Sequence, residues 1–213
     1  RRASANSWHG GWLMAFEGNS ILGLIARLRG AFYHRSDNLP RLLYTATASA
    51  TVANTTTETS IIGTGVGSLS MPVAAVAAPP VAATPFWFAG KTIRVRVMGY
   101  ISQLVAGPNR TVKIYLGSTA LGTVGPSSVA TAVTNVGFLY EFLITCRTAG
   151  ATGTAFTQAT LFHSGIGQNY MNATSTVTID TTAAAALDVK FTWGTADPGN
   201  TITSTNVTVE ALN

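Results

Sequence analysis

Residues 186–212 read ALDVKFTWGTADPGNTITSTNVTVEAL, and this stretch decides the fold of the chain. On both sides of GTADPGN (194–200), Val, Phe and Ile alternate with Thr, Lys and Asn. That alternation is typical of strands that have one buried and one exposed face. Asp, Pro and Gly between them indicate a loop slightly longer than a tight hairpin. The stretch therefore predicts two sheet strands, with Trp193 as a core or rim anchor.

The same alternation continues outward from this stretch. KTIRVRVMGYIS (91–102) places Ile93, Val95 and Val97 on one face, and RTVKIYLG (110–117) repeats the pattern. About eight to ten strands separated by turn clusters predict an all-β fold, an antiparallel β-sandwich. The jelly roll is the commonest way to close that many strands. Further strands are expected at residues 45–53, 59–65, 138–148, 154–164 and 175–180.

A change in composition near SDNLPRLLY (36–44) divides the chain. We expect an N-terminal arm over residues 1–41 and a β-sandwich domain over 42–213. Apolar residues recur at spacings of three and four from residue 21 to 32, which predicts a short amphipathic, basic helix. Two turns of helix are not stable alone in water, so its apolar face must dock on its own domain or on a neighbouring subunit. The expected assembly interface of the arm consists of Trp12, Phe16, Leu24, Arg27, Leu28, Arg29 and Phe32.

The segment MPVAAVAAPPVAATPFWFAG (71–90) does not fit the strand pattern. Its four prolines exclude a regular helix or a central strand, yet it carries no charge. Apolar irregular chain of this length is usually covered. It either packs along its own sandwich or is covered by another subunit, and Phe86, Trp87 and Phe88 form the expected anchor and second assembly interface.

Charged residues make up only 10% of the chain, against about a quarter in typical proteins. The net charge of +5 is concentrated in the arm, where six arginines face two acidic residues up to Arg41. Those arginines alternate with aromatic and leucine side chains, a mixture that suits a protein surface better than phosphates. We therefore do not expect nucleic acid as a partner, and the neutral sandwich surface suits packing against other protein.

The sequence contains no pattern that points to catalysis or to a metal. Cys146 is the only cysteine, and its apolar surroundings predict a buried thiol. The histidines have no metal-ligand spacing, and G-x-S-x-G does not occur. Asp180 and Asp188 are expected in a turn and on an outward strand position. The glycines of IIGTGVGS (61–68) lack the Walker ending and predict a bulge or sheet corner. We expect no enzyme activity, no catalytic residues, no metal and no cofactor.

Targeting signals are not evident either. No run approaches the roughly 18 to 20 apolar residues that a membrane span needs, and the arginines inside SILGLIARLRGAF (20–32) do not fit a secretory signal. The expectation is a chain made and folded in a cytoplasm, with no membrane partner.

Residues 57–212 resemble a family of β-sandwich proteins encoded in many tailed bacteriophages and prophages. The resemblance rests on TETSIIGTGVGSLSMP (57–72), GKTIRVRVMGYIS (90–102), CRTAGATGTAF (146–156) and STVTIDTTAAAALDVKFTWGTADPGNTITSTNVTVE (175–210). It implies a non-enzymatic virion component with a jelly-roll-like fold that assembles into oligomers. Residues 1–41 lie outside it.

The first functional hypothesis is a capsid decoration or cement protein that binds the outer shell through its arm. Its partners would be the major capsid protein or other virion proteins and further copies of itself, with a trimer expected by fold-level analogy. It would be located in the virion, after assembly in the host cytoplasm. One alternative is a tail, baseplate or fibre component that contacts the host surface, with Tyr100, Tyr115 or Tyr170 as the platform for a glycan. The other is a genome-enclosing single jelly-roll coat protein.

Overall fold

The computed structural model describes residues 40–71, 86–104, 109–127, 132–164, 167–171 and 176–213. This part of the chain is all-β and contains no helix. Every pair of neighbouring strands runs antiparallel. The strands are β1 (Arg41–Ala46), β2 (Ala50–Ala53), β3 (Thr59–Ser60), β4 (Gly65–Gly67), β5 (Ser70–Met71), β6 (Thr92–Gln103), β7 (Arg110–Leu116), β8 (Thr119–Ser127), β9 (Val133–Thr148), β10 (Gly153–His163), β11 (Gly167–Met171), β12 (Val177–Ile179), β13 (Ala185–Trp193) and β14 (Thr201–Ala211).

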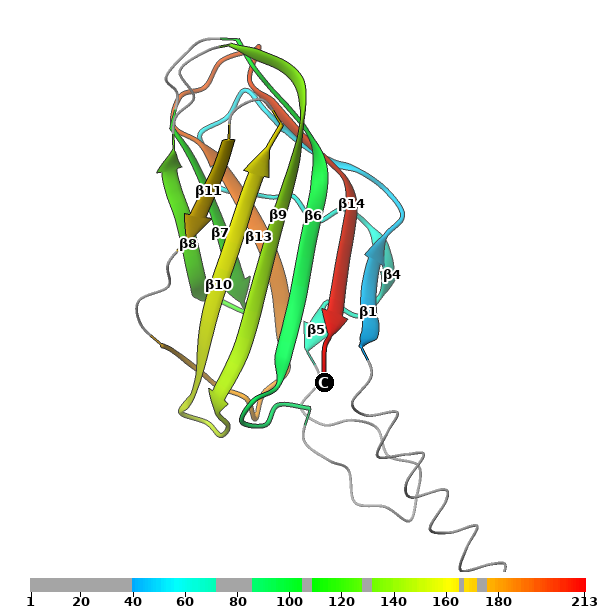
Figure 1. The fold of residues 1–213 in the computed structure, drawn as a ribbon, viewed down its shortest axis with the longest axis vertical. Coiled ribbons are helices and arrows are strands. Elements are labelled where there is room, and N and C mark those ends of the chain that lie inside the picture. The colour runs from blue at the N-terminus through cyan, green and yellow to red at the C-terminus, as the bar shows by residue number, and fades with distance from the viewer. Residues whose placement is uncertain (1–39, 72–85, 105–108, 128–131, 165–166, 172–175) are drawn as a thin grey trace, which may run out of the picture. The chain divides into compact units, whose positions relative to one another are not determined.

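The strands form two sheets packed face to face (Figure 1). In the large sheet the order is β11-β10-β9-β6-β14-β1-β4, with β12 also paired to β10 and β2 to β14. In the small sheet the order is β3-β13-β7-β8, with β5 also paired to β13. The central orders β1-β14-β6-β9 and β3-β13-β7-β8, followed along the chain, are those of an eight-stranded jelly roll. The expected jelly-roll sandwich is therefore confirmed, and β10, β11 and β12 widen its large sheet.

The last two strands do not form a hairpin. β13 pairs with β3, β5 and β7 in the small sheet, whereas β14 pairs with β1, β2 and β6 in the large one. The connecting residues 194–200 cross between the sheets, and Asp197 shapes the turn because its carboxylate accepts a hydrogen bond from the Gly199 N–H at 2.8 Å. The two predicted strands are present, but each covers the core from the opposite side.

The core lies between the sheets and consists of alternate residues of each strand. Ile93, Val95 and Val97 of β6 are completely buried, as predicted, and the expected face of β7 is at most 5% exposed. Trp193 is also completely buried and meets Phe191 edge to face at 4.9 Å between ring centroids. Its predicted role as a core anchor is confirmed, and the Cys146 thiol is buried as expected.

Glycine is required at position 99 of β6, where the backbone of β14 lies close by. A Cβ atom on Gly99 would lie 1.9 Å from the Thr203 carbonyl oxygen. The β6–β14 register shifts directly beside it, between Ser204 and Asn206. Such an irregularity is a β-bulge, which bends a strand locally. In the predicted glycine corner, Gly67 of β4 has a φ of 101°, which confirms the need for a residue without Cβ there.

Replacing Gly99 with Ala is expected to lower the free energy of unfolding by about 1–3 kcal/mol, because the methyl group must push two backbones apart. Gly137 of β9 is the matched control. A Cβ there has only one neighbour, the Gly99 carbonyl oxygen at 4.0 Å. The urea concentration at the unfolding midpoint of Gly137→Ala should therefore equal or exceed that of the wild type. Urea unfolding of both variants measures the difference, and equal midpoints would contradict the close-approach argument.

Candidate functional site

The predicted loop interface is mostly part of the protein's own core. Phe86 is 9% exposed and Trp87 2% exposed, and their rings meet edge to face at 5.3 Å. Phe88 is 44% exposed. The first two rings therefore belong to the core of their own domain. Residues 72–85 of the same segment lie outside the described part of the chain, so the two alternatives stay predictions for them. Of the predicted loop interface, Phe88 alone is available to a partner.

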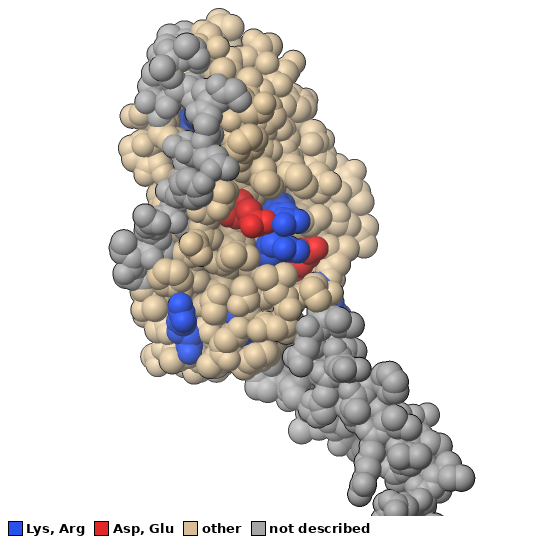
Figure 2. Space-filling model, in the orientation of Figure 1, with Lys and Arg blue, Asp and Glu red and all other residues tan. Residues whose placement is uncertain are grey.

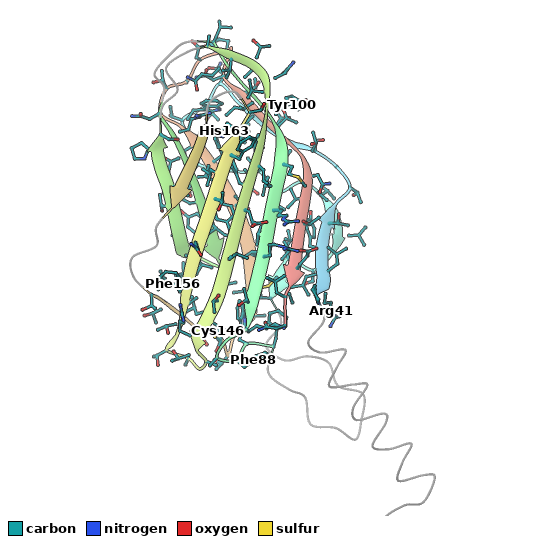
Figure 3. The ribbon with its side chains drawn as sticks, in the orientation of Figure 1. Arg41, Phe88, Tyr100, Cys146, Phe156 and His163 are labelled. Atoms are coloured by element: carbon teal, nitrogen blue, oxygen red, sulfur yellow. The ribbon has the colours of Figure 1, made fainter. Side chains whose placement is uncertain are left out.

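Phe88 is held by a network of contacts at this end of the sandwich (Figure 3). The Lys91 ammonium group lies 5.5 Å from the centroid of the Phe88 ring and 5.1 Å from that of Phe86. Lys91 also donates a hydrogen bond to the carbonyl oxygen of Asn213. The Asn213 amide in turn donates to the Gly90 carbonyl at 2.9 Å and accepts from the backbone N–H that follows Lys91, also at 2.9 Å. Phe88 is therefore an exposed ring on a well-fixed turn.

Five other large apolar side chains are exposed in the described part of the chain, in different places. Leu42 and Val66 lie on neighbouring strands β1 and β4 at one edge of the large sheet. Tyr100 belongs to β6, Leu104 follows that strand, and Phe162 belongs to β10. Single exposed apolar side chains are normal on protein surfaces. The β1–β4 edge is the place where two of them occur on paired strands.

The outer face of the large sheet carries two cross-strand ion pairs. Arg94 of β6 lies directly opposite Glu210 of β14, and Arg96 of β6 directly opposite Glu141 of β9. The shortest N–O distances are 2.5 Å in both pairs. Figure 2 shows these red and blue atoms together near the middle of a face that is otherwise almost free of charge. The four charges of these two pairs cancel, while a separate blue group toward the lower left of Figure 2 has no red neighbour.

A second group of charges lies on the outer face of the small sheet. Lys113 of β7 donates to Glu58 at 2.7 Å, and the Tyr115 hydroxyl donates to the other oxygen of that carboxylate at 2.7 Å. The hydrogen bond from Lys113 is the main reason why the pKa of Glu58 is lowered. Lys190 of β13 stacks over the Tyr115 ring at 4.7 Å from its centroid. Tyr115, a candidate glycan platform, is thus a mid-strand residue engaged by its own neighbours.

A buried polar cluster, formed by Arg110, Tyr140 and His163, lies between the two sheets. The Tyr140 hydroxyl and His163 Nε2 are 2.9 Å apart, and their rings meet at a steep angle. Burial raises the pKa of Tyr140 far above its usual value. Burial, and secondarily the positive charge of Arg110, lowers the pKa of His163 from 6.5 to about 4. At neutral pH both rings are therefore uncharged, and Arg110 carries the only charge of the cluster.

The described residues do not bring the candidate carboxylates together. Asp180 accepts hydrogen bonds from the backbone N–H of Thr182 at 2.8 Å and from its hydroxyl at 2.6 Å, as a turn residue does. Asp188 lies on β13 and accepts from the Ser60 hydroxyl at 2.6 Å. Both positions agree with the sequence prediction. Within the described ranges, no group of three or more His, Cys, Asp or Glu side chains could hold a metal ion, and no helix has the length and hydropathy of a membrane span.

All seven predicted interface residues of the arm lie in residues 1–39, outside the described part of the chain. The side chain of Tyr170 is likewise not described. Tyr100 lies in β6 and is exposed near the end of the sandwich that also holds His163 (Figure 3). The arm interface, and with it the expected contact with a shell, stays a prediction.

Sequence reasoning missed the buried polar cluster, although the pattern contained a signal. Arg110 stands two residues before Val112 and therefore shares the inward phase of β7. His163 has the same relation to Leu161 in β10. Extending the alternation to the ends of these strands would have placed both polar side chains inside the sandwich.

Comparisons with family models, curated proteins and solved structures find no match to this chain.

The depressed pKa of His163 predicts acid sensitivity. Between pH 6.5 and about 4 the unfolded chain binds a proton that the folded protein excludes, so the free energy of unfolding should fall as the pH decreases across this range. The loss is about 3 kcal/mol when the shift is converted at 1.36 kcal/mol per unit.

Urea unfolding at several pH values measures this loss. In His163→Gln the free energy of unfolding should depend much less on pH across this range. Tyr140→Phe is the control, because it retains the histidine and should keep the steep dependence. His9 and His34 are present in all three proteins, so they cannot account for a difference. An equally steep dependence in His163→Gln would contradict the assignment.

Proposed function

We propose that this protein is a non-enzymatic structural component of a tailed-bacteriophage virion that decorates the outer surface of the capsid. The observation that carries the proposal is the jelly-roll strand order, β1-β14-β6-β9 against β3-β13-β7-β8. Viral capsid proteins are among the main users of this architecture. Because a fold does not specify a function by itself, the surface chemistry and the family resemblance have to support the proposal.

The surface of the sandwich supports an assembly role. The cores of protein interfaces are depleted of charge, and here Glu58, Glu141 and Glu210 are each paired with a cation of the same sheet surface. Threonine hydroxyls and small side chains cover much of the remainder. The exposed apolar side chains of the β1–β4 edge and Phe88 then offer contacts that require little desolvation of charge.

The resemblance of residues 57–212 to β-sandwich proteins of tailed phages and prophages supports the same proposal and suggests the partners. These are the major capsid protein, or other virion proteins, and further copies of this chain, with a trimer as the expected oligomer. The arm would grip the shell or a neighbouring copy through Leu24, Leu28 and Phe32.

The arm can be tested separately from the fold. Leu24→Asp and Phe32→Asp should weaken binding to empty shells by about tenfold or more, because each places a charge in the expected apolar contact. Both variants should keep the wild-type melting temperature. Ser36→Asp adds the same charge to a polar position of the arm and should bind normally. Co-sedimentation with shells and thermal unfolding are the two measurements. Normal binding by both variants would contradict the arm interface.

Cryo-electron microscopy of particles that carry this protein tests its location. Sandwich density on the outer shell with icosahedral placement is the expected result. Density confined to the tail would overturn the decoration role in favour of a tail or fibre component. A continuous inner shell around the genome would instead identify a coat protein.

A further inference from the structure

One guanidinium group is enclosed between the sheets and has no hydrogen-bond partner among the described residues. Arg110 is only 2% exposed, and its Nε, Nη1 and Nη2 atoms are all buried. None of the three donates a hydrogen bond within the described structure. Arginine stays protonated in proteins, so this group carries a full positive charge in a medium of low dielectric constant. A buried charge of this kind is costly unless an opposite charge accompanies it.

The described part of the chain does not supply that opposite charge. Its Tyr140 and His163 neighbours are neutral. Each side-chain carboxylate of the described residues either pairs with a group other than Arg110 or lies in a turn. Glu58, Glu141 and Glu210 pair with Lys113, Arg96 and Arg94 on the outer faces; Asp188 accepts from Ser60; Asp180 and Asp197 shape turns. Compensation for Arg110 must therefore come from outside this set.

The groups around Arg110 define what could compensate it. Trp193 of β13 is its direct cross-strand partner, and the indole Nε1–H is also buried without a hydrogen-bond acceptor in the described structure. Directly opposite residues on one face of a sheet have Cβ atoms roughly 5 Å apart. The guanidinium group offers five N–H bonds in a planar fork, and the indole adds one more. The guanidinium group and the indole are both donors only, so the partner that these two side chains lack is an acceptor.

We propose that Arg110 and Trp193 form an internal binding site for a small oxyanion of the carboxylate or phosphate class, enclosed at one end of the sandwich. Two oxygens of such an ion fit the guanidinium fork side by side, which a spherical ion such as chloride does not. A third contact comes from the indole N–H. The ion neutralises Arg110 and joins the small sheet to the neutral Tyr140–His163 pair of the large one. The site does not depend on the proposed virion role.

Thermal unfolding of the full chain in sodium phosphate or sodium acetate tests the site, with sodium chloride added to hold the ionic strength constant. Once the oxyanion concentration exceeds the dissociation constant, each further tenfold increase in that concentration should raise the melting temperature of the wild type by about 3–5 °C. Arg110→Met, which is similar in length but uncharged, should lose this response. Arg147→Met is the matched control, because Arg147 is exposed and stacks on the Phe156 ring. Its response should equal that of the wild type.

Two results would overturn the proposal. One is an equal rise in Arg110→Met, which would reduce the effect to general exclusion of these salts from protein surfaces. The other is a wild-type melting temperature that does not respond to either oxyanion beyond the chloride control. If Arg110→Met does not fold, NMR of the wild type decides. A buried, slowly exchanging arginine Nε–H signal should shift on titration with phosphate or acetate, and a signal that stays in place would refute the site.

Discussion

The pairing of β14 with β6 is the contact on which the rest of the sandwich depends. β14 comes last among the strands, yet it lies between β6 on one side and β1 and β2 on the other. It therefore connects the beginning of the described chain to its middle. The ladder is continuous except at the bulge beside Gly99, where the backbone of β14 leaves no room for a Cβ atom. The outward ion pair of Arg94 with Glu210 and the fully buried inward face of β6 follow from this one register.

The interior between the sheets has two ends of different character. At the end near Phe88, the rings of Phe86 and Trp87 are buried, and the Lys91 ammonium group lies over the Phe86 ring. The opposite end holds the Arg110, Tyr140 and His163 side chains. Apolar burial stabilises the first end, and this contribution does not depend on the protonation of a side chain or on a bound ion. The stability of the second depends on protonation and on the charge that accompanies Arg110, so the two ends respond differently to solution conditions.

The alternating pattern of the sequence predicted the strands that become the centre of both sheets, together with their buried faces. It did not predict β8, because Gly122, Gly125 and Pro126 interrupt the alternation. A strand at the edge of the small sheet tolerates such residues, since its outer side needs no partner. Nor could the alternating pattern assign β13 and β14 to different sheets. The two strands would bury alternate residues both as a hairpin within one sheet and as strands of opposite sheets.

The candidate site was less predictable than the fold, for a physical reason. An aromatic triplet such as Phe86–Phe88 signals burial but does not tell whether its own domain or a partner covers it. Arg110 was overlooked because arginine is rarely buried, so composition argued against what the strand phase indicated.

The edges of the sheets have a consequence for the protein as a solute. The large sheet ends at β4, which has three residues, and at β11, which has five; the small sheet ends at β3, which has two, and at the proline-bearing β8. Long, flat edges would let copies join backbone to backbone into fibres, and short or interrupted ones resist this. A threonine-rich chain with so little charge cannot rely on electrostatic repulsion to stay dispersed. Its blunt edges therefore disfavour backbone pairing between copies and leave side-chain contacts as the route to association.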